Sequence, residues 1–236
     1  MRSTQDWSRL GGVVIALLAA GVALTVLMPR LLGMAAGPEV EIITALKSTE
    51  QDRLELAIPG AGARLTSQTH HFARITVSVE PGGQRAVASA TLDFSGRLGR
   101  TEVSSLGVEQ VPFVLRGREW VPEGLAAPRL AAVVGALEAR RRALEAGDRK
   151  TLMALRGPGE AGDGGGEAEV ERVLALQRRR YEARAWYLRL ERDEAVVTEE
   201  WRLEGVLPSR PVDEKGQRRL SLIRSGEEFL FSPGLM

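Results

Sequence analysis

Hydrophobic residues are arranged in two ways along this chain: as one unbroken apolar stretch near the N-terminus, and as periodic patterns after it. The stretch covers residues 10–28, which carry no charge, and Arg9 and Arg30 lie on either side of it. A helix of this length spans about 28 Å, close to the ~30 Å hydrocarbon core of a bilayer. The pattern predicts an N-terminal tail at 1–9, a membrane anchor at 10–28 and a linker at 29–38.

Charged residues around this stretch predict its orientation. Arg2, Arg9 and the terminal amine precede it, whereas Arg30 follows it and is itself followed by Glu39 and Glu41. Basic residues are enriched on the cytoplasmic side of membrane helices. We therefore expect a single-pass protein of the cytoplasmic (inner) membrane, with the N-terminus inside and the C-terminal part in the periplasm or a similar extracytoplasmic space.

A cleaved secretory signal is the alternative interpretation of the same stretch. Cleavage after Ala35 would place Gly33 and Ala35 at the small-residue positions that such sites use. The length of the apolar stretch and the Pro29-Arg30 pair after it favour a retained anchor.

Small residues recur every four positions within the predicted anchor, at Gly12, Ala16 and Ala20. Such a ridge allows two membrane helices to approach closely, so these residues predict helix packing in the membrane. The alternative is that Gly and Ala are simply common in membrane helices.

Beyond the anchor, three segments recur in the same order at similar separations, which suggests an internal repeat. The matched pairs are 45–60 with 143–159, 86–96 with 195–205, and 114–124 with 222–234. We interpret residues 39–125 and 128–236 as two diverged copies of one unit. The alternative is that only the second copy is a folded domain and the first is a spacer.

Periodicity in the second copy predicts helices followed by strands. An apolar stripe predicts a helix over 128–146. Gly147-Asp148 is expected to end this helix and to cap a short second one. A third helix is expected with one face formed by Val170, Val173, Leu174, Gln177 and Tyr181. Alternating segments then predict half-buried antiparallel strands, and the first copy shows the same strand set. The fold class is therefore α+β, with helices packed on one face of a curved antiparallel sheet in each unit.

This order of elements resembles the nuclear-transport-factor-2-like (cystatin-like) cone fold, closely over the second copy and loosely over the first. A membrane helix followed by two such domains is similar to the bitopic inner-membrane subunits of type IV secretion and conjugation systems. The resemblance implies either an assembly domain or a small-molecule isomerase, because the fold serves both. Catalysis in this family resembles a carboxylate working with a tyrosine or a second acid inside the cone. Only Tyr181 and Tyr187 are available here, and no catalytic set is visible.

The amino-acid composition limits the classes of partner and metal site that the chain can have. The chain has 32 Lys and Arg residues against 31 Asp and Glu residues, which argues against a nucleic-acid partner, and it has no cysteine. The two histidines, His70 and His71, are adjacent at a predicted strand end. Neighbouring strand residues point to opposite faces, so the pair is poorly placed to share a metal ion. We expect a solvated strand end, no metal and no cofactor.

Glu199 is the candidate for acid–base chemistry. Alternation places it on the same face as Val197, Trp201 and Leu203, inside the predicted cone and close to Trp186. A carboxylate in an apolar pocket tends to have a raised pKa, as a general acid or base requires. The alternative is that an arginine pairs with it or that a bulge turns it outward. Glu199, Trp201, Trp186 and Leu203 form the predicted ligand pocket, with no catalytic residue assigned.

Two arginine triplets, 140–142 and 178–180, are predicted on helices of the second copy. They are interpreted as a solvated helix face balanced by nearby glutamates, the alternative being a patch for anionic lipid or an acidic partner. Together these patterns predict a membrane-anchored, non-catalytic envelope protein that contacts other envelope proteins or itself. The alternative is a ligand-binding or isomerase-like cone centred on Glu199 and Trp201.

Overall fold

The computed structural model describes residues 37–157, 165–208 and 210–232. The elements are α2 Pro38–Ser48, η1 Thr49–Gln51, β1 Glu55–Ala57, β2 Arg64–Val79, β3 Arg85–Leu98, β4 Thr101–Arg116, β5 Glu119–Pro122, α3 Pro128–Ala146, α4 Arg149–Ala154, α5 Gly165–Leu174, β6 Gln177–Leu190, β7 Glu194–Leu207, β8 Arg210–Ser225 and β9 Glu228–Phe231. The predicted anchor, with Gly12, Ala16 and Ala20, lies outside these residues. Within the described ranges, no helix is long and apolar enough to cross a membrane.

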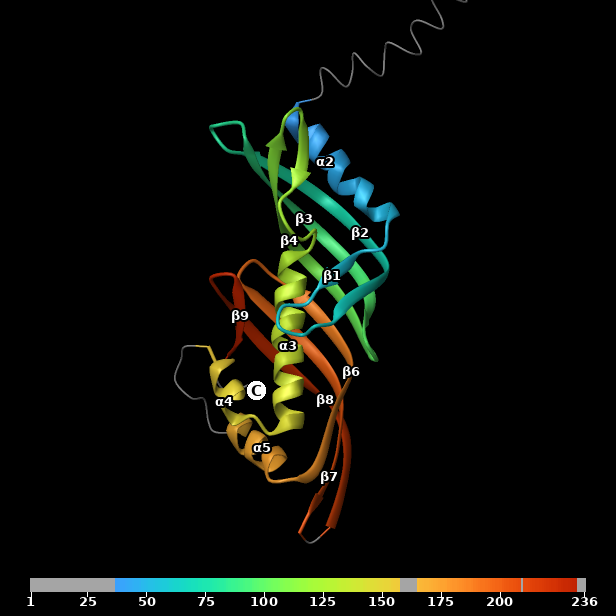
Figure 1. Ribbon diagram of the computed structural model, residues 1–236, viewed down its shortest axis with the longest axis vertical. Helices are drawn as coiled ribbons and strands as arrows, with labels where there is room; N and C mark the ends of the chain where they lie inside the picture. The colour runs from blue at the N-terminus through green and yellow to red at the C-terminus, as the bar shows by residue number, and fades with distance from the viewer. Residues whose placement is uncertain (1–36, 158–164, 209, 233–236) are drawn as a thin grey trace, which may run out of the picture.

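The strands of both predicted copies form one nine-stranded sheet, in the order β1-β2-β3-β4-β6-β7-β8-β9, with β5 paired to β4. The two strand sets meet where Glu102–Gly107 of β4 pairs with Ala185–Leu190 of β6, and this pairing is parallel. All other pairings are antiparallel. The sheet is curved and the helices lie against it, α3 in front of the junction between the two strand sets (Figure 1), so the predicted α+β class is confirmed.

The two strand sets have the same internal order. Segment 86–96 lies in β3 and its match 195–205 lies in β7, and each is the middle strand of a three-stranded antiparallel meander. The short strands β5 and β9 then pair back onto the ends of β4 and β8, and each contributes a buried aromatic residue at its second position, Trp120 and Phe229. That each copy folds as a separate domain stays a prediction.

Helix α3 connects the two strand sets. Pro128 occupies its first turn, and Gly147 ends it with the left-handed conformation (φ 76°) that glycine adopts without strain. Asp148 then caps α4 by accepting the backbone N–H of Thr151 at 3.0 Å, as the sequence predicted. Leu130 and Leu137 of α3 lie in the main core with residues from both strand sets. Its C-terminal end, at Leu144, belongs to a second, smaller core.

The predicted third helix is shorter than expected. Helix α5 ends at Leu174 and strand β6 begins at Gln177, so Tyr181 and the 178–180 arginine triplet lie on a strand and not on a helix. A spacing of four residues returns to the same face in both a helix and a strand, so the Gln177–Tyr181 spacing does not distinguish them. Pairing with β7 decides the outcome, because it provides backbone partners from Gln177 onward.

Candidate functional site

Glu199 lies at the middle of β7, between Trp186 of β6 and Arg218 of β8 in the sheet register. Val197, two residues before it, and Leu203, four residues after it, are fully buried, so the strand alternation that the sequence predicted places Glu199 on the inner face. The side chain is 1% exposed. A carboxylate so deeply buried requires internal hydrogen-bond donors.

Four side chains supply contacts to the Glu199 carboxylate. Oε1 accepts from the indole N–H of Trp186 at 3.1 Å. Oε2 accepts from the hydroxyl of Tyr181 at 2.7 Å and from Nη1 of Arg140 at 3.1 Å. Arg218 places its Nε 3.3 Å from the same oxygen. These contacts come from α3, β6 and β8, so they join a helix and three neighbouring strands around one charge.

Aromatic rings enclose the two arginines of this cluster. The Arg218 guanidinium lies over the Trp201 ring at 4.5 Å, and Trp201 stacks on Tyr181 with 6.4 Å between ring centroids. Arg140 lies 5.8 Å from the ring of Phe231. Burial, together with the negative charge of Glu199, raises the pKa of Tyr181, so its hydroxyl keeps its proton and acts as a donor.

Arg140 corrects the interpretation of the first arginine triplet. Its side chain is 1% exposed and points from α3 toward Glu199, so it is not part of a solvated face. Arg141 and Arg142 do pair with glutamates, as expected from the helical spacing, through contacts to Glu138 at 2.7 and 2.8 Å. The first and last members of the triplet are about 200° apart around the helix axis, so its members face different environments.

The structure brings together only part of the predicted pocket. Trp186 and Glu199 are hydrogen-bonded, and Trp201 lies beside them against Arg218. Leu203 lies farther along β7, fully buried in the smaller core. Tyr181 was predicted on a helix and instead completes the cluster from β6.

A surface pocket of about 260 Å³ borders this cluster at Tyr181. Its other walls carry charges of both signs, including Arg100, Glu138, Arg141 and Glu145. Burial alone would raise the pKa of Glu138, but hydrogen bonds from Arg141 and Arg142 outweigh it and lower that pKa. Glu138 therefore stays ionised at the edge of the pocket, paired with Arg141 and Arg142.

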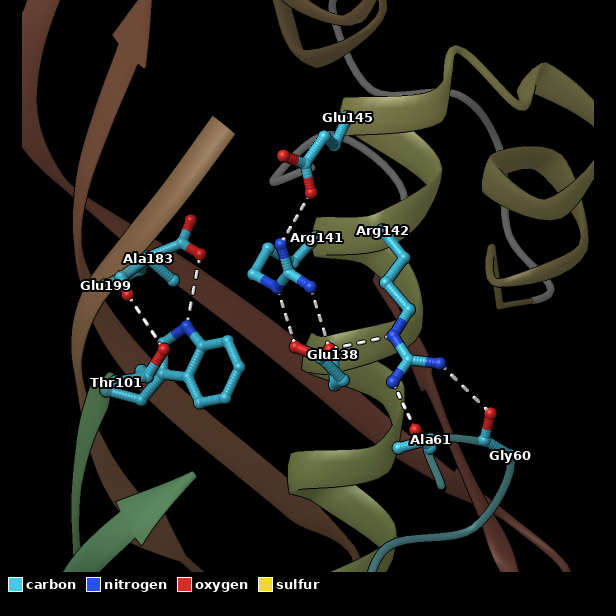
Figure 2. Close-up of polar contacts among 10 residues, drawn as sticks. Gly60, Ala61, Thr101, Glu138, Arg141, Arg142, Glu145, Ala183 and Glu199 are labelled. Carbon is cyan, nitrogen blue, oxygen red and sulfur yellow. Dashed lines mark hydrogen bonds and ion pairs between the residues drawn. The ribbon is translucent and has the colours of Figure 1, made fainter. Parts of the chain in front are cut away.

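Glu138 also links the two halves of the molecule through Arg142. Arg142 donates to the backbone carbonyl of Gly60 at 3.3 Å and to that of Ala61, in the loop between β1 and β2 (Figure 2). Nearby, the Thr101 hydroxyl of β4 donates to the carbonyl of Ala183 in β6 at 2.8 Å. Both contacts tie the first strand set to elements of the second.

Glu109 is a second buried carboxylate, which the sequence reasoning missed. It is fully buried on β4 and accepts the backbone N–H groups of Arg129 at 3.1 Å and Leu130 at 2.6 Å, at the start of α3. Burial raises the pKa of Glu109 to about 7 against the effect of these hydrogen bonds. The sequence does contain an indication of this position: alternation along β4 places Glu109 on the same inner face as the buried Val111 and Phe113.

Glu109 and Arg218 hold equivalent positions in the two strand sets. Glu109 pairs in register with Ala90 of β3, and Arg218 pairs with Glu199 of β7, the residue aligned with Ala90. The same position of the inner face thus carries a carboxylate in the first set and a guanidinium in the second. Both make internal contacts: Glu109 accepts backbone N–H groups at the start of α3, and Arg218 contacts the buried carboxylate of Glu199.

The two histidines lie on opposite faces of β2. His70 is buried edge-on against Phe72, and burial lowers its pKa, which corrects the expectation that both are solvated. His71 is exposed, with Nδ1 3.3 Å from Glu50. In the part of the chain that the structure describes, no group of three or more His, Asp or Glu side chains is arranged to hold a metal ion.

No family model matches the chain. No curated protein matches it either. Among solved structures, a "putative ketosteroid isomerase" of Shewanella frigidimarina is similar with 13% identity and a TM-score of 0.36, covering 42% of this chain and 90% of its own. An NTF2-like protein involved in plasmid conjugation has 9% identity and a TM-score of 0.33, covering 72% of this chain and 76% of its own. Similarities this low define neither the fold nor the activity of this chain.

Proposed function

We propose that the protein is a membrane-anchored, non-catalytic subunit that acts through contacts with other envelope proteins. The observation that carries this proposal is an exposed apolar patch, the seam patch, formed by Leu106, Val108 and Tyr187 on the outer face of the sheet. These side chains are 57%, 38% and 46% exposed. Leu106 and Tyr187 lie in the paired segments of β4 and β6, and Val108 lies just beyond that pairing on β4. Exposed apolar clusters of this kind are typical of protein interaction sites.

The buried carboxylates support a structural role over a catalytic one. Glu199 is surrounded by internal donors, Glu109 is bound to the first backbone N–H groups of α3, and Glu138 is held by two arginines. A general base needs a free lone pair within reach of a substrate proton. Each of these carboxylates instead holds elements of the fold together.

The predicted anchor at 10–28 would confine the domain to a thin layer beside the inner membrane. Confinement raises the effective concentration of partners in the same layer, so contacts that are weak in solution become occupied. A subunit of a secretion, conjugation or motility complex fits this description.

Crosslinking in intact cells, followed by mild-detergent purification and mass spectrometry, tests the proposal. We expect other envelope proteins to be recovered with the full chain, and to be lost in Leu106→Arg and Tyr187→Arg variants. Arg118→Glu is the control, because it changes an exposed charge in the turn between β4 and β5, at the far end of β4 from the seam patch. Equal recovery from all three variants would remove the seam patch as the interaction site.

A second candidate function, a ligand-binding or isomerase-like cone, is favoured by one observation. Tyr181 both lines the 260 Å³ pocket and donates to Glu199, so it connects the buried carboxylate to a surface opening. A small molecule that co-purifies with the wild-type chain and is lost from Glu199→Gln would support this function. Retention of every phenotype in Glu199→Gln would exclude it.

A further inference from the structure

The nine-stranded sheet has exposed edges, and most of their length is protected. At one end, the outer edge of β9 is covered by residues 155–157, because Phe231 exchanges backbone hydrogen bonds with Leu155 and Gly157. Beyond β9, the edge of β8 carries Pro211, a glycine and several charged residues over 210–219. Proline and charge on an edge strand prevent pairing with another chain.

At the other end, β2 is covered over its first half. Residues 64–66 pair with β1, and Ser67 exchanges hydrogen bonds with Leu54. At Phe72, the backbone N–H donates to Glu50 at 2.5 Å, and the backbone C=O accepts from Lys47. Lys47 in the last turn of α2 and Glu50 in η1 thus cap the edge as far as Phe72.

The second half of β2, residues 74–79, has β3 as its strand partner and no strand on its other side in the described part of the chain. Helix α2 does not occupy that side. It contacts both β2 and β5, which lie on opposite sides of β3 and β4, so it crosses the inner face of the sheet.

The pattern of backbone hydrogen bonds between β2 and β3 shows which residues of β2 turn their N–H and C=O groups outward along this edge. Glu80 donates its N–H to Arg85 across the hairpin at 2.9 Å, so Glu80 faces β3. Because hydrogen-bonded and non-hydrogen-bonded residues alternate along the regular part of the pair, Val77 and Val79 present their N–H and C=O groups away from β3. Ile75 lies at the register shift between Ala73 and Thr76, just before this regular part. The regularly paired residues 76–79, which follow a bulge at Arg74 (φ 50°) and Ile75, are β-branched or small and include no proline or charge, so they are suited to strand addition.

We infer that this edge binds a second copy of the same chain, by antiparallel pairing of residues 74–80 about a two-fold axis at Val77. In that register, Ile75 lies opposite Val79 of the second copy, and Thr76 lies opposite Ser78. Arg74, at the bulge that precedes this regular segment, would lie near Glu80 of the second copy, and both are exposed in this chain. The segment is therefore self-complementary in shape, polarity and charge, which an isologous two-fold interface requires.

Pairing of this kind joins the two sheets into one without any rearrangement of the described strands. The half-buried side chains of Ile75, Val77 and Val79 lie on the core side of β2 and would meet their counterparts there. The inference rests on the proposed function in taking the chain to act by protein contacts. It adds the identity of one partner and the strand that binds it.

Cysteine crosslinking of the full chain in native membranes tests the pairing, because the wild-type chain contains no cysteine. In a hydrogen-bonded pair the two Val77 Cα atoms would lie about 5.5 Å apart, within disulfide range. We expect Val77→Cys to form a disulfide dimer on mild oxidation. Lys215→Cys, on the charged edge of β8, is the control and should stay monomeric. A monomeric Val77→Cys, or equal dimer yields from both variants, would overturn the inference.

A charge reversal tests the register. In the Val77→Cys background, Arg74→Glu places like charges opposite each other twice and should slow dimer formation about tenfold. Adding Glu80→Arg restores both pairs and should restore the rate, whereas an unchanged rate in Arg74→Glu would contradict the register. The crosslinking of other envelope proteins is scored separately, so failure of the edge pairing and failure of the proposed function are distinguishable.

Discussion

The hydroxyl of Tyr181 donates to the carboxylate of Glu199 at 2.7 Å, on the same oxygen that accepts from Arg140. Tyr181 and Glu199 lie on adjacent strands, and Arg140 lies on the helix that packs against them. A single carboxylate oxygen thus holds α3 to the second strand set. The stability of the molecule is therefore expected to be sensitive to each partner.

Replacement of Arg140 by methionine should lower the free energy of unfolding by about 3–5 kcal/mol, because it removes a buried partner of Glu199 and leaves packing volume in place. Urea denaturation measures this. Arg64→Met is the control, since Arg64 pairs with Glu55 on the surface and such pairs contribute less than about 1 kcal/mol. Similar losses in the two variants would show that the buried contact contributes no more to stability than the surface ion pair.

Tyr181→Phe keeps the ring that stacks on Trp201 and removes the hydroxyl that donates to Glu199. We expect a loss of about 1–3 kcal/mol in the free energy of unfolding, as for a buried acceptor deprived of one donor. Tyr187→Phe is the matched control, because Tyr187 is exposed on the outer face of the same strand. An unchanged stability of Tyr181→Phe would mean that the hydroxyl is dispensable to the cluster.

Glu109 predicts a pH dependence of stability. Its pKa in the folded protein is raised to about 7 by burial, above its usual value of 4.5, so the folded state binds the proton more tightly than the unfolded chain. Stability from this group is therefore full below about pH 4.5 and decreases by about 3 kcal/mol as the pH rises to about 7.

The measurement is the difference in free energy of unfolding between the wild type and Glu109→Gln, followed from pH 4 to 8. We expect that difference to change in favour of the glutamine variant as the pH rises through this range. A difference that stays constant with pH would contradict the raised pKa of Glu109.

Arg142 predicts a local effect at the loop between β1 and β2. Arg142→Ala removes the donors to the carbonyls of Gly60 and Ala61, so backbone amides at 58–63 should exchange with solvent about five- to tenfold faster. Hydrogen exchange with mass spectrometry measures this. Arg141→Ala serves as control, because Arg141 shares Glu138 with Arg142 and has its other hydrogen bond to Glu145. Equal exchange rates in the two variants would show that the hydrogen bonds from Arg142 do not stabilise the loop.

Much of the fold follows from local patterns in the sequence. Pro128 and Gly147 mark the ends of α3, and Asp148 caps α4, because each acts on backbone groups within a few residues. Alternation in β7 placed Glu199 on the inner face for the same reason, since strand geometry sends every second side chain to one side. The internal match between 86–96 and 195–205 likewise located equivalent strands.

The partners of those residues depended on the tertiary structure. Nothing near Glu199 in the sequence indicates Arg140 or Arg218, because a hydrogen bond between side chains depends on the packing of a helix against a sheet. The parallel pairing of β4 with β6, which makes one sheet of two strand sets, also has no local signature. The sequence by itself determined the segments and the faces they bury, through short-range backbone geometry. Only the tertiary structure decided which buried charges meet and which edge of the sheet stays open.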